Sequence, residues 1–250
     1  MVAAIGSWIE ARRLQGRWLV RIDDLDPPRV VPGVIDDILR TLEAFGLTWD
    51  GPVVYQSQRN ERYREALVNL IDNGDVFPCF CSRKDLEGFR VYPGTCRDRK
   101  DLEGRTWRFK SGIGRIEWED RYLGISQLNR ATDVGDFLVR GVKDVFSYHL
   151  ANVVDDSDFE VTHVIRGSDL VESTGCHILL QSALGFNEVQ YGHLPLALDE
   201  NGIKLSKQTH ARPVEAQEAS VCIQQVLCHL GILDVELDSP SAMLNAALRS

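Results

Sequence analysis

Segments with helical and strand-like spacing alternate in the N-terminal part of the chain. Apolar residues recur at helical spacing in three stretches, residues 1–14, 34–45 and 59–73, each followed closely by a glycine. Between these stretches, residues 17–22 alternate in strand fashion, and residues 53–55 form a short apolar strand. This order predicts an α/β fold, in which ligands bind beside the carboxyl ends of strands.

Polar and charged residues stand where several predicted strands end. Asp23 directly follows the strand at 17–22, and a further parallel strand at 160–167 carries Arg166 near its end. The segment 148–156 runs apolar into a pair of acids. We expect four candidate binding residues to lie in order on successive strand ends: Asp23, Tyr148, Asn152 and Arg166. Plainer interpretations are a turn cap for Asp23, a surface ion pair for Arg166, and core-edge polar residues for the other two.

Two lysines, Lys204 and Lys207, flank a short loop after the apolar run at 193–198. The dipeptide Asn201-Gly202 before them marks a tight turn. Two ammonium groups on such a loop could hold a polyphosphate and stabilise charge on a leaving group. For an isolated motif of this kind, a solvated surface loop is the more frequent outcome.

Three cysteines, Cys79, Cys81 and Cys96, are crowded into eighteen positions. In a chain without a secretory signal, this crowding favours a metal site over disulfides. Three thiolates are strong zinc ligands, and the fourth ligand is left open among Tyr92, Asp85, Asp98 and water. The alternative is three buried cysteines that pack as small hydrophobic residues.

The other cysteines, Cys176, Cys222 and Cys228, are predicted to be core thiols, and the six histidines receive no catalytic role. The 250 residues have 44% hydrophobic content and a net charge of −9, which fits a globular protein and argues against nucleic-acid binding driven by total charge. The sequence has no run long enough for a membrane span, so a cytoplasmic protein is expected, with a monomer favoured.

Several motifs occur together and in order: 21–29 (RIDDLDPPR), 148–156 (YHLANVVDD), 164–170 (VIRGSDL) and 204–207 (KLSK). With them the chain resembles the class I glutamyl-tRNA synthetases from residue 1 to about 212. The resemblance implies a Rossmann-like catalytic domain with a zinc-bearing insertion and a short helical C-terminal region. The expected limits are 1–75 and 137–212 for the two halves of the catalytic domain, 76–136 for the insertion and 213–250 for the helical region.

The resemblance also implies roles for the candidate residues. Asp23 would bind the glutamate ammonium, Tyr148 and Asn152 would face the side-chain carboxylate, and Arg166 would bind a carboxylate of the same amino acid. Lys204 and Lys207 would be catalytic, with Lys207 on the phosphates of ATP, which binds with Mg²⁺. The family places structural zinc on the residues that match Cys79, Cys81, Tyr92 and Cys96. It often has Glu where this chain has Asp23, so the carboxylate here is one methylene shorter.

The length and several motifs are most similar to the short paralogues of that family, which consist of the catalytic domain. These paralogues attach glutamate to the queuosine base of tRNA(Asp), so the implied partners are L-glutamate, ATP and tRNA, with tRNA(Asp) preferred. One alternative is a fragment of an ordinary glutamyl-tRNA synthetase that charges tRNA(Glu), in which case the reading frame continues beyond Ser250. The other is a noncatalytic binding module of synthetase-like fold.

One motif of the class I enzymes is missing from the sequence. These enzymes carry a strand and turn with a His-x-Gly-His type motif before their first helix, and Met1 aligns with that helix. We therefore expect that the first strand and its turn are lacking, through a late start assignment or a real loss. On that expectation these 250 residues use ATP poorly, and restoring the upstream coding sequence recovers the activity.

Overall fold

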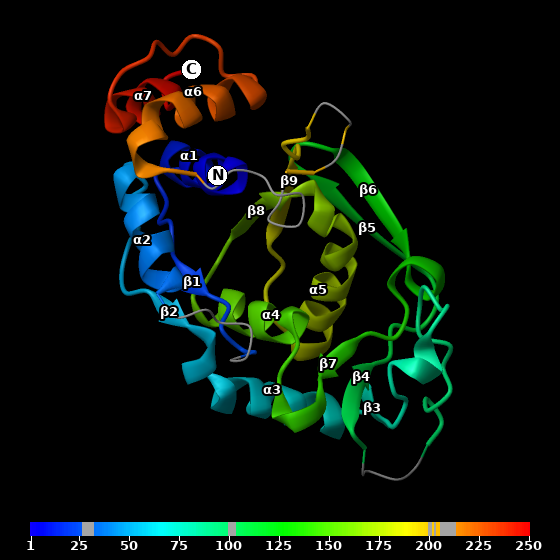
Figure 1. Ribbon diagram of the computed structural model, residues 1–250. Coiled ribbons are helices and arrows are strands. Elements are labelled where there is room, and N and C mark those ends of the chain that lie inside the picture. Colours follow the sequence, from blue (N-terminus) through cyan, green and yellow to red (C-terminus); the bar gives the residue numbers. More distant parts are fainter. Residues whose placement is uncertain (27–32, 100–103, 200–201, 203, 206–213) are drawn as a thin grey trace.

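The computed structural model describes residues 1–26, 33–99, 104–199, 202, 204–205 and 214–250 (Figure 1). The helices are α1 (Val2–Arg13), α2 (Val34–Ala44), α3 (Asn60–Asp72), α4 (Tyr148–Asp158), α5 (Val171–Leu184), α6 (Ala219–His229) and α7 (Pro240–Ala247). The strands are β1 (Arg21–Ile22), β2 (Val54–Tyr55), β3 (Val76–Cys79), β4 (Thr106–Phe109), β5 (Arg115–Asp120), β6 (Gly124–Asn129), β7 (Leu138–Arg140), β8 (His163–Gly167) and β9 (Gln190–Leu194). The mixed α/β class predicted from the sequence is confirmed.

The described strands form three sheets. β1 and β2 pair in parallel, and β3, β4 and β7 form an antiparallel sheet in that order. The third sheet has the order β6-β5-β9-β8, in which β8 and β9 run parallel. Arg166 of β8 stands opposite His193 of β9 in this register. The side chain that was expected at a strand end therefore has a histidine on the neighbouring strand.

The helices at both ends of the chain agree with the sequence patterns. The three N-terminal stretches form α1, α2 and α3, and α6 and α7 lie within 213–250, where a helical region was expected. Met1 stands at the N-cap of α1 and makes no side-chain cap. The first strand is shorter than expected, since within 17–22 only Arg21 and Ile22 pair with β2.

The expectation that Tyr148 and Asn152 lie at a strand end was wrong, because their segment forms helix α4. The Ser147 hydroxyl accepts a hydrogen bond from the backbone N–H of Leu150 at 3.3 Å and caps the helix. Residues 150–156 are all buried, so the segment lacks the polar face that marks an exposed helix. Tyr148 and Asn152 are one turn apart and therefore lie on the same helix face.

The described residues form two large hydrophobic cores and a smaller cluster of Phe77, Cys79 and Cys96. The first core packs α3, α4 and α5 against β4 and β7, and includes Tyr63, Leu150 and Leu180. The second core packs α1, α2, α6 and α7 together, and includes Ile5 and Ile223. Figure 1 shows α1, α2, α6 and α7 on one side of the molecule and α3, α4 and α5 toward the other. The two cores therefore divide the protein into two packed halves.

The segment expected to be an insertion, 76–136, is joined to the rest of the fold by strand pairing. β3 and β4 lie in one sheet with β7, and β5 pairs with β9 through Asp120 opposite Tyr191. The domain limits predicted from the sequence stay a prediction. Within the described ranges, none of the helices has the length and apolar character needed to cross a membrane.

Candidate functional site

A cavity of about 720 Å³ lies between strands that belong to different sheets. Residues 16–21, which lead into β1, form one wall, and residues 161–166, which include most of β8, form another. The polar side chains that line it include Arg21, Tyr148, Asn152, Asp156, Arg166 and His177. The structure thus brings three of the four expected amino-acid-binding residues to one cavity.

Arg166 is a buried cation whose five N–H donors all have neutral partners among the described residues. It is only 7% exposed. Nε donates to His193 Nε2 at 3.2 Å, and Nη2 donates to Thr174 Oγ1 at 2.7 Å and to the Leu170 carbonyl at 3.1 Å. Nη1 has the longer contacts, to the Tyr148 hydroxyl at 3.3 Å and to His177 Nδ1 at 3.4 Å.

The two edges of this guanidinium differ in what they contact. His193, the partner of Nε, does not line the cavity, and of the two partners of Nη2 only Leu170 does, whereas both partners of Nη1, Tyr148 and His177, line it. A buried cation without a contacting carboxylate is costly, and a carboxylate forms shorter and stronger hydrogen bonds with arginine than a neutral group does. The Nη1 edge is therefore suited to a carboxylate ligand.

The amide of Asn152 is oriented by a residue that the sequence did not point to. Gln56, in the 3-10 helix η2 (Gln56–Gln58), is fully buried and donates from Nε2 to Asn152 Oδ1 at 2.9 Å. Because Oδ1 accepts this bond, the Nδ2 donors of Asn152 point away from Gln56. Asn152 lines the cavity, so its amide can donate to a ligand oxygen there.

Asp23 lies two residues beyond Arg21 and is not among the residues that line the cavity. Its side chain is exposed, yet partial desolvation raises the pKa of its carboxyl, and the nearby acids Asp24 and Asp155 add to the rise while Arg21 opposes it. Asp24 accepts hydrogen bonds from the hydroxyl and the backbone N–H of Ser57. Ser57 thus fixes the loop after β1.

The lysine segment is described only in part. Lys204 forms an isolated bridge with Leu198, and its ammonium lies 2.5 Å from Asp169 Oδ2. Asp169 belongs to the 3-10 helix η6 (Ser168–Leu170), which directly follows β8 and Arg166. Lys204 is thus placed just past the end of the strand that carries Arg166. Lys207 lies outside the described residues.

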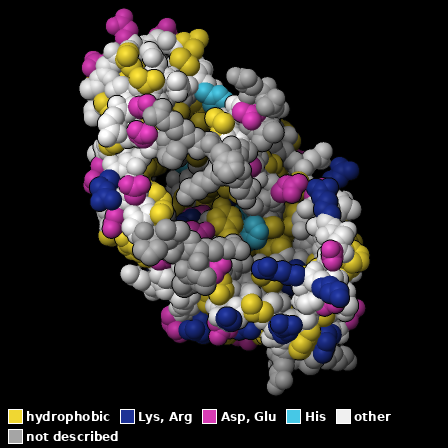
Figure 2. Space-filling model, viewed as in Figure 1, with side chains coloured by type: hydrophobic (Ala, Val, Ile, Leu, Met, Phe, Trp, Pro, Cys, Tyr) yellow, Lys and Arg dark blue, Asp and Glu magenta, His cyan; other side chains and the backbone are white. Residues whose placement is uncertain are grey.

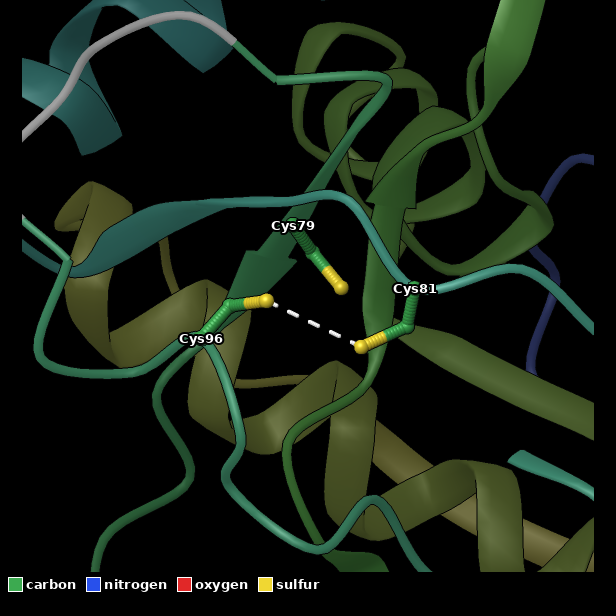
Figure 3. A group of neighbouring side chains, drawn as sticks. All are labelled: Cys79, Cys81 and Cys96. Carbon is green, nitrogen blue, oxygen red and sulfur yellow. Dashed lines mark hydrogen bonds between the residues drawn. The ribbon is translucent and has the colours of Figure 1, made fainter. Parts of the chain in front are cut away.

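Cys79, Cys81 and Cys96 point toward one another (Figure 3), and their sulfur atoms all lie within 4.8 Å of each other. The sulfurs of Cys81 and Cys96 are 3.7 Å apart. The hydroxyl of Tyr92 lies 3.5 Å from the Cys79 sulfur and 3.6 Å from the Cys81 sulfur. The cysteine group could hold a metal ion, and Tyr92 is the neighbouring oxygen among the candidate residues for the fourth ligand.

Burial works against ionisation of the Cys96 thiol, but hydrogen bonds from the Phe80 backbone and from Tyr92 outweigh it and lower its pKa to about 7. A thiolate is the form that binds metals. Among the other cysteines, Cys176 is buried and Cys222 is half-buried. The prediction of a core thiol was wrong for Cys228, which lies on the exposed side of α6.

The buried imidazole of His149 is expected to make the protein less stable in mild acid. Burial lowers its pKa to about 4, with a further contribution from Arg166. The unfolded chain therefore binds this proton as the pH falls below about 6.5, whereas the folded protein binds it only near pH 4. The contribution of neutral His149 is fully present above pH 6.5, and we expect up to about 3 kcal/mol of the free energy of unfolding to be lost as the pH falls to 4.

Chemical unfolding at pH 7, 6, 5 and 4 measures this effect. His149→Phe should reduce the slope and leave the part that His177 and His193 supply, since burial lowers the pKa of these two residues as well. His229→Phe, at an exposed position of α6, should leave the slope unchanged. An equal slope in the wild type and in His149→Phe would exclude His149 as the cause.

Sequence reasoning missed three residues that the fold brings to the cavity, Arg21, Asp156 and His177, and it missed Gln56, which contacts the cavity residue Asn152. Arg21 stands two positions before Asp23, so the strand alternation places both on one face and could have indicated it. Asp156 lies in α4, one turn after Asn152, whereas Gln56 and His177 come from separate segments that meet α4 only in the folded chain.

The chain matches the family model of the class I tRNA synthetases (E and Q), catalytic domain, over residues 2–108 and 97–220. It is 45% identical over 242 residues to the glutamyl-Q tRNA(Asp) synthetase of Dechloromonas aromatica, a match that covers 92% of this chain and 80% of that protein. It is 46% identical over 244 residues to the protein of the same name from Synechococcus sp., covering 93% and 81%.

A solved structure with a similar fold is the crystal structure of a glutamate tRNA ligase from Elizabethkingia meningosepticum in complex with its amino acid. The match has a TM-score of 0.80 at 23% sequence identity, and it covers 97% of this chain. The chain spans 60% of that longer protein. At this identity the similarity shows the fold.

Proposed function

The chain belongs to the glutamyl-Q tRNA(Asp) synthetase family of class I tRNA synthetases, and from this premise we propose that it activates glutamate with ATP and transfers the glutamyl group to the queuosine base of tRNA(Asp). The observation that carries the proposal is the buried guanidinium of Arg166, which contacts neutral groups only among the described residues and has one edge at the cavity. An amino-acid carboxylate supplies the negative charge that this site lacks.

The cavity offers groups for the two carboxylates of glutamate, and the loop after β1 offers one for its ammonium. Arg166 binds one carboxylate through Nη1, while the Tyr148 hydroxyl and the Asn152 amide donate to the side-chain carboxylate. Asp23, at the end of β1, takes the ammonium. A glutamate held in this way has its α-carboxylate fixed for attack, and such positioning supplies much of the rate enhancement in reactions of this kind.

In the first step, an oxygen of the α-carboxylate attacks the α-phosphorus of ATP. The bond from that phosphorus to the bridging oxygen breaks, and pyrophosphate leaves with the electron pair. Lys204 and Lys207 stabilise the negative charge of the phosphates, which bind with Mg²⁺. The side chains of Lys204 and Asp169 are 47% and 38% exposed, so their ion pair is weak. A triphosphate can therefore replace Asp169 as the partner of Lys204 at little cost.

Zinc is the metal that best fits the cysteine group. Zn–S bonds of ~2.3 Å in a tetrahedron place two sulfur ligands ~3.8 Å apart, and a phenolic oxygen bound at ~2.1 Å lies ~3.6 Å from each sulfur. The observed separations of 3.7 Å between Cys81 and Cys96, and of 3.5 and 3.6 Å from the Tyr92 hydroxyl, agree with this geometry. Cys79, Cys81, Cys96 and Tyr92 would hold the ion as a structural site.

Replacement of a single ligand tests the zinc site. We expect Cys96→Ser to lower the zinc content from about one ion per chain to near zero, because a structural site needs its full ligand set. Cys228→Ser, at the exposed thiol, is the matched control and should retain the metal. The measurement is elemental analysis of protein purified without chelator, and unchanged zinc in Cys96→Ser contradicts the assignment.

The charge distribution supports an approach of RNA from one side. Figure 2 shows Lys and Arg side chains gathered over α3, β3 and β4 and along β5 and β6, whereas the face over α6 and α7 carries mainly Asp and Glu among its charged groups. Part of this positive charge is neutralised, since Arg62 and Arg64 of α3 pair with Glu65 and Glu61, and the chain as a whole has a net charge of −9. Phosphate groups are attracted to such a local patch.

Two assays of the purified protein test the function. Glutamate-dependent exchange of pyrophosphate into ATP reports the first step, and transfer of labelled glutamate to queuosine-containing tRNA(Asp) reports the second. We expect both pyrophosphate exchange and labelling of queuosine-containing tRNA(Asp), and we expect no labelling of tRNA(Asp) that lacks queuosine. Labelling of the 3′ end of tRNA(Glu) would instead favour the ordinary glutamyl-tRNA synthetase reaction, and glutamate binding without exchange would favour a binding module.

A further inference from the structure

Asp120 and His193 form a buried pair, in which His193 contacts Arg166. Neither residue of the pair lines the cavity. His193 Nδ1 lies 2.5 Å from Asp120 Oδ2, and both side chains are fully buried. Asp120 Oδ1 also accepts the backbone N–H of His193 at 3.1 Å, together with those of Tyr122 and Leu123. Asp120 is thus a fixed acceptor that holds the imidazole in one orientation.

This contact determines which nitrogen of His193 faces Arg166. The proton on Nδ1 serves the bond to Asp120, which leaves Nε2 as an acceptor. Nε2 lies 3.2 Å from Arg166 Nε and 3.2 Å from Thr174 Oγ1. Burial lowers the pKa of His193, which keeps the ring neutral and the acceptor available.

The three charged or polar side chains come from adjacent strands. Asp120 ends β5, His193 lies in β9 and Arg166 lies in β8, and the sheet order is β5-β9-β8. Arg166 and His193 are direct partners in the parallel register. A line of hydrogen bonds therefore crosses the sheet from Asp120 to Arg166 and ends at the cavity, with the strand spacing fixing the distances.

We propose that Asp120 and His193 are positioning residues for glutamate recognition, which fix the Nε edge of Arg166 and so direct its Nη1 edge into the cavity. The proposal rests on the proposed function, in which Arg166 binds a carboxylate of glutamate. Without the pair, Nε has no acceptor, and on the side away from Nη1 only Nη2 keeps its hydrogen bonds, to Thr174 and Leu170. The guanidinium can then rotate. Donors that are ordered before the ligand arrives bind its charge more tightly.

Two replacements of His193 separate its two contacts. His193→Gln places an amide oxygen near the position of Nε2 and retains an acceptor for Arg166. His193→Asn places an amide nitrogen near Nδ1 and retains only the bond to Asp120. We expect His193→Asn to weaken glutamate binding, measured by calorimetry, roughly 10- to 100-fold. The KM for ATP should not change. His193→Gln should bind glutamate with an affinity close to that of the wild type. Equal binding by His193→Asn and the wild type, or equal losses in both variants, would overturn the proposal.

Nitrogen NMR of the wild-type protein gives a test that needs neither activity nor a variant. We expect His193 to carry its proton on Nδ1, and the Nε–H of Arg166 to be protected from exchange. A proton on Nε2 of His193 contradicts the positioning role, and so does an unprotected Arg166 Nε–H. If the wild type does not bind glutamate while the NMR result is as expected, the proposed function fails and the positioning of Arg166 stands.

Discussion

Replacement of Asp155 by leucine is expected to lower the free energy of unfolding by about 3–5 kcal/mol. Asp155 is fully buried in α4 and accepts hydrogen bonds from three side chains of the segment 56–63, which runs from η2 into α3. Its partners are Arg59 Nε at 2.6 Å, Gln56 Nε2 at 2.9 Å and the Tyr63 hydroxyl at 3.0 Å. The leucine removes every one of these acceptors and leaves buried donors unpaired, which costs more than the loss of a surface contact.

Asp158→Leu is the matched control for this change. Asp158 lies one turn along the same helix and pairs with Arg59 and Arg62, but its side chain is 23% exposed. We expect that replacement to lower the free energy of unfolding by about 1 kcal/mol or less. Urea unfolding of both variants measures the two free energies of unfolding. Similar decreases in the two variants would show that the burial of Asp155 does not determine its contribution to stability.

Replacement of Arg166 by lysine is expected to lower kcat/KM for glutamate in pyrophosphate exchange by roughly 30- to 4,000-fold. Lysine retains one positive charge but cannot occupy both edges of the guanidinium site, so buried acceptors and the substrate carboxylate lose their partners. Loss of one member of a buried charge pair costs about 2–5 kcal/mol, and each 1.4 kcal/mol is tenfold. The KM for ATP should change little.

Arg90→Lys makes the same chemical change at an exposed ion pair with Glu172 and should leave the exchange rate unaffected. Thermal unfolding of both variants separates a folding defect from a binding defect. A folded Arg166→Lys protein with wild-type kcat/KM for glutamate would remove Arg166 from the substrate site.

The sequence predicted those elements whose signal is local. The helices α1, α2 and α3 were found because each has one apolar face and a glycine near its end. The approach of Cys79, Cys81 and Cys96 was found because the ligands lie close together along the chain. α4 was missed as a helix because residues 150–156 are buried on all sides, and a continuous apolar run does not distinguish a buried helix from a strand.

The second layer around the site could not be predicted in the same way. Gln56 meets Asn152 from a segment 96 positions earlier, and Asp120 meets His193 across 73 positions. Nothing in the residue types around either pair indicates the partner, since both contacts exist only through the order of strands and helices in the fold. The groups that orient the expected site residues therefore become visible only in three dimensions.

The position of the cavity between the two hydrophobic cores links ligand binding to the cooperativity of folding. Its wall at 16–21 packs with the second core through Val20, while Tyr148, Asn152 and His177 project from helices of the first core. A ligand that touches both walls gains its full binding free energy only when both halves are folded and correctly placed. Substrate occupancy thus strengthens the coupling between the two cores, which the packing of α1 against β8 already joins in the protein itself.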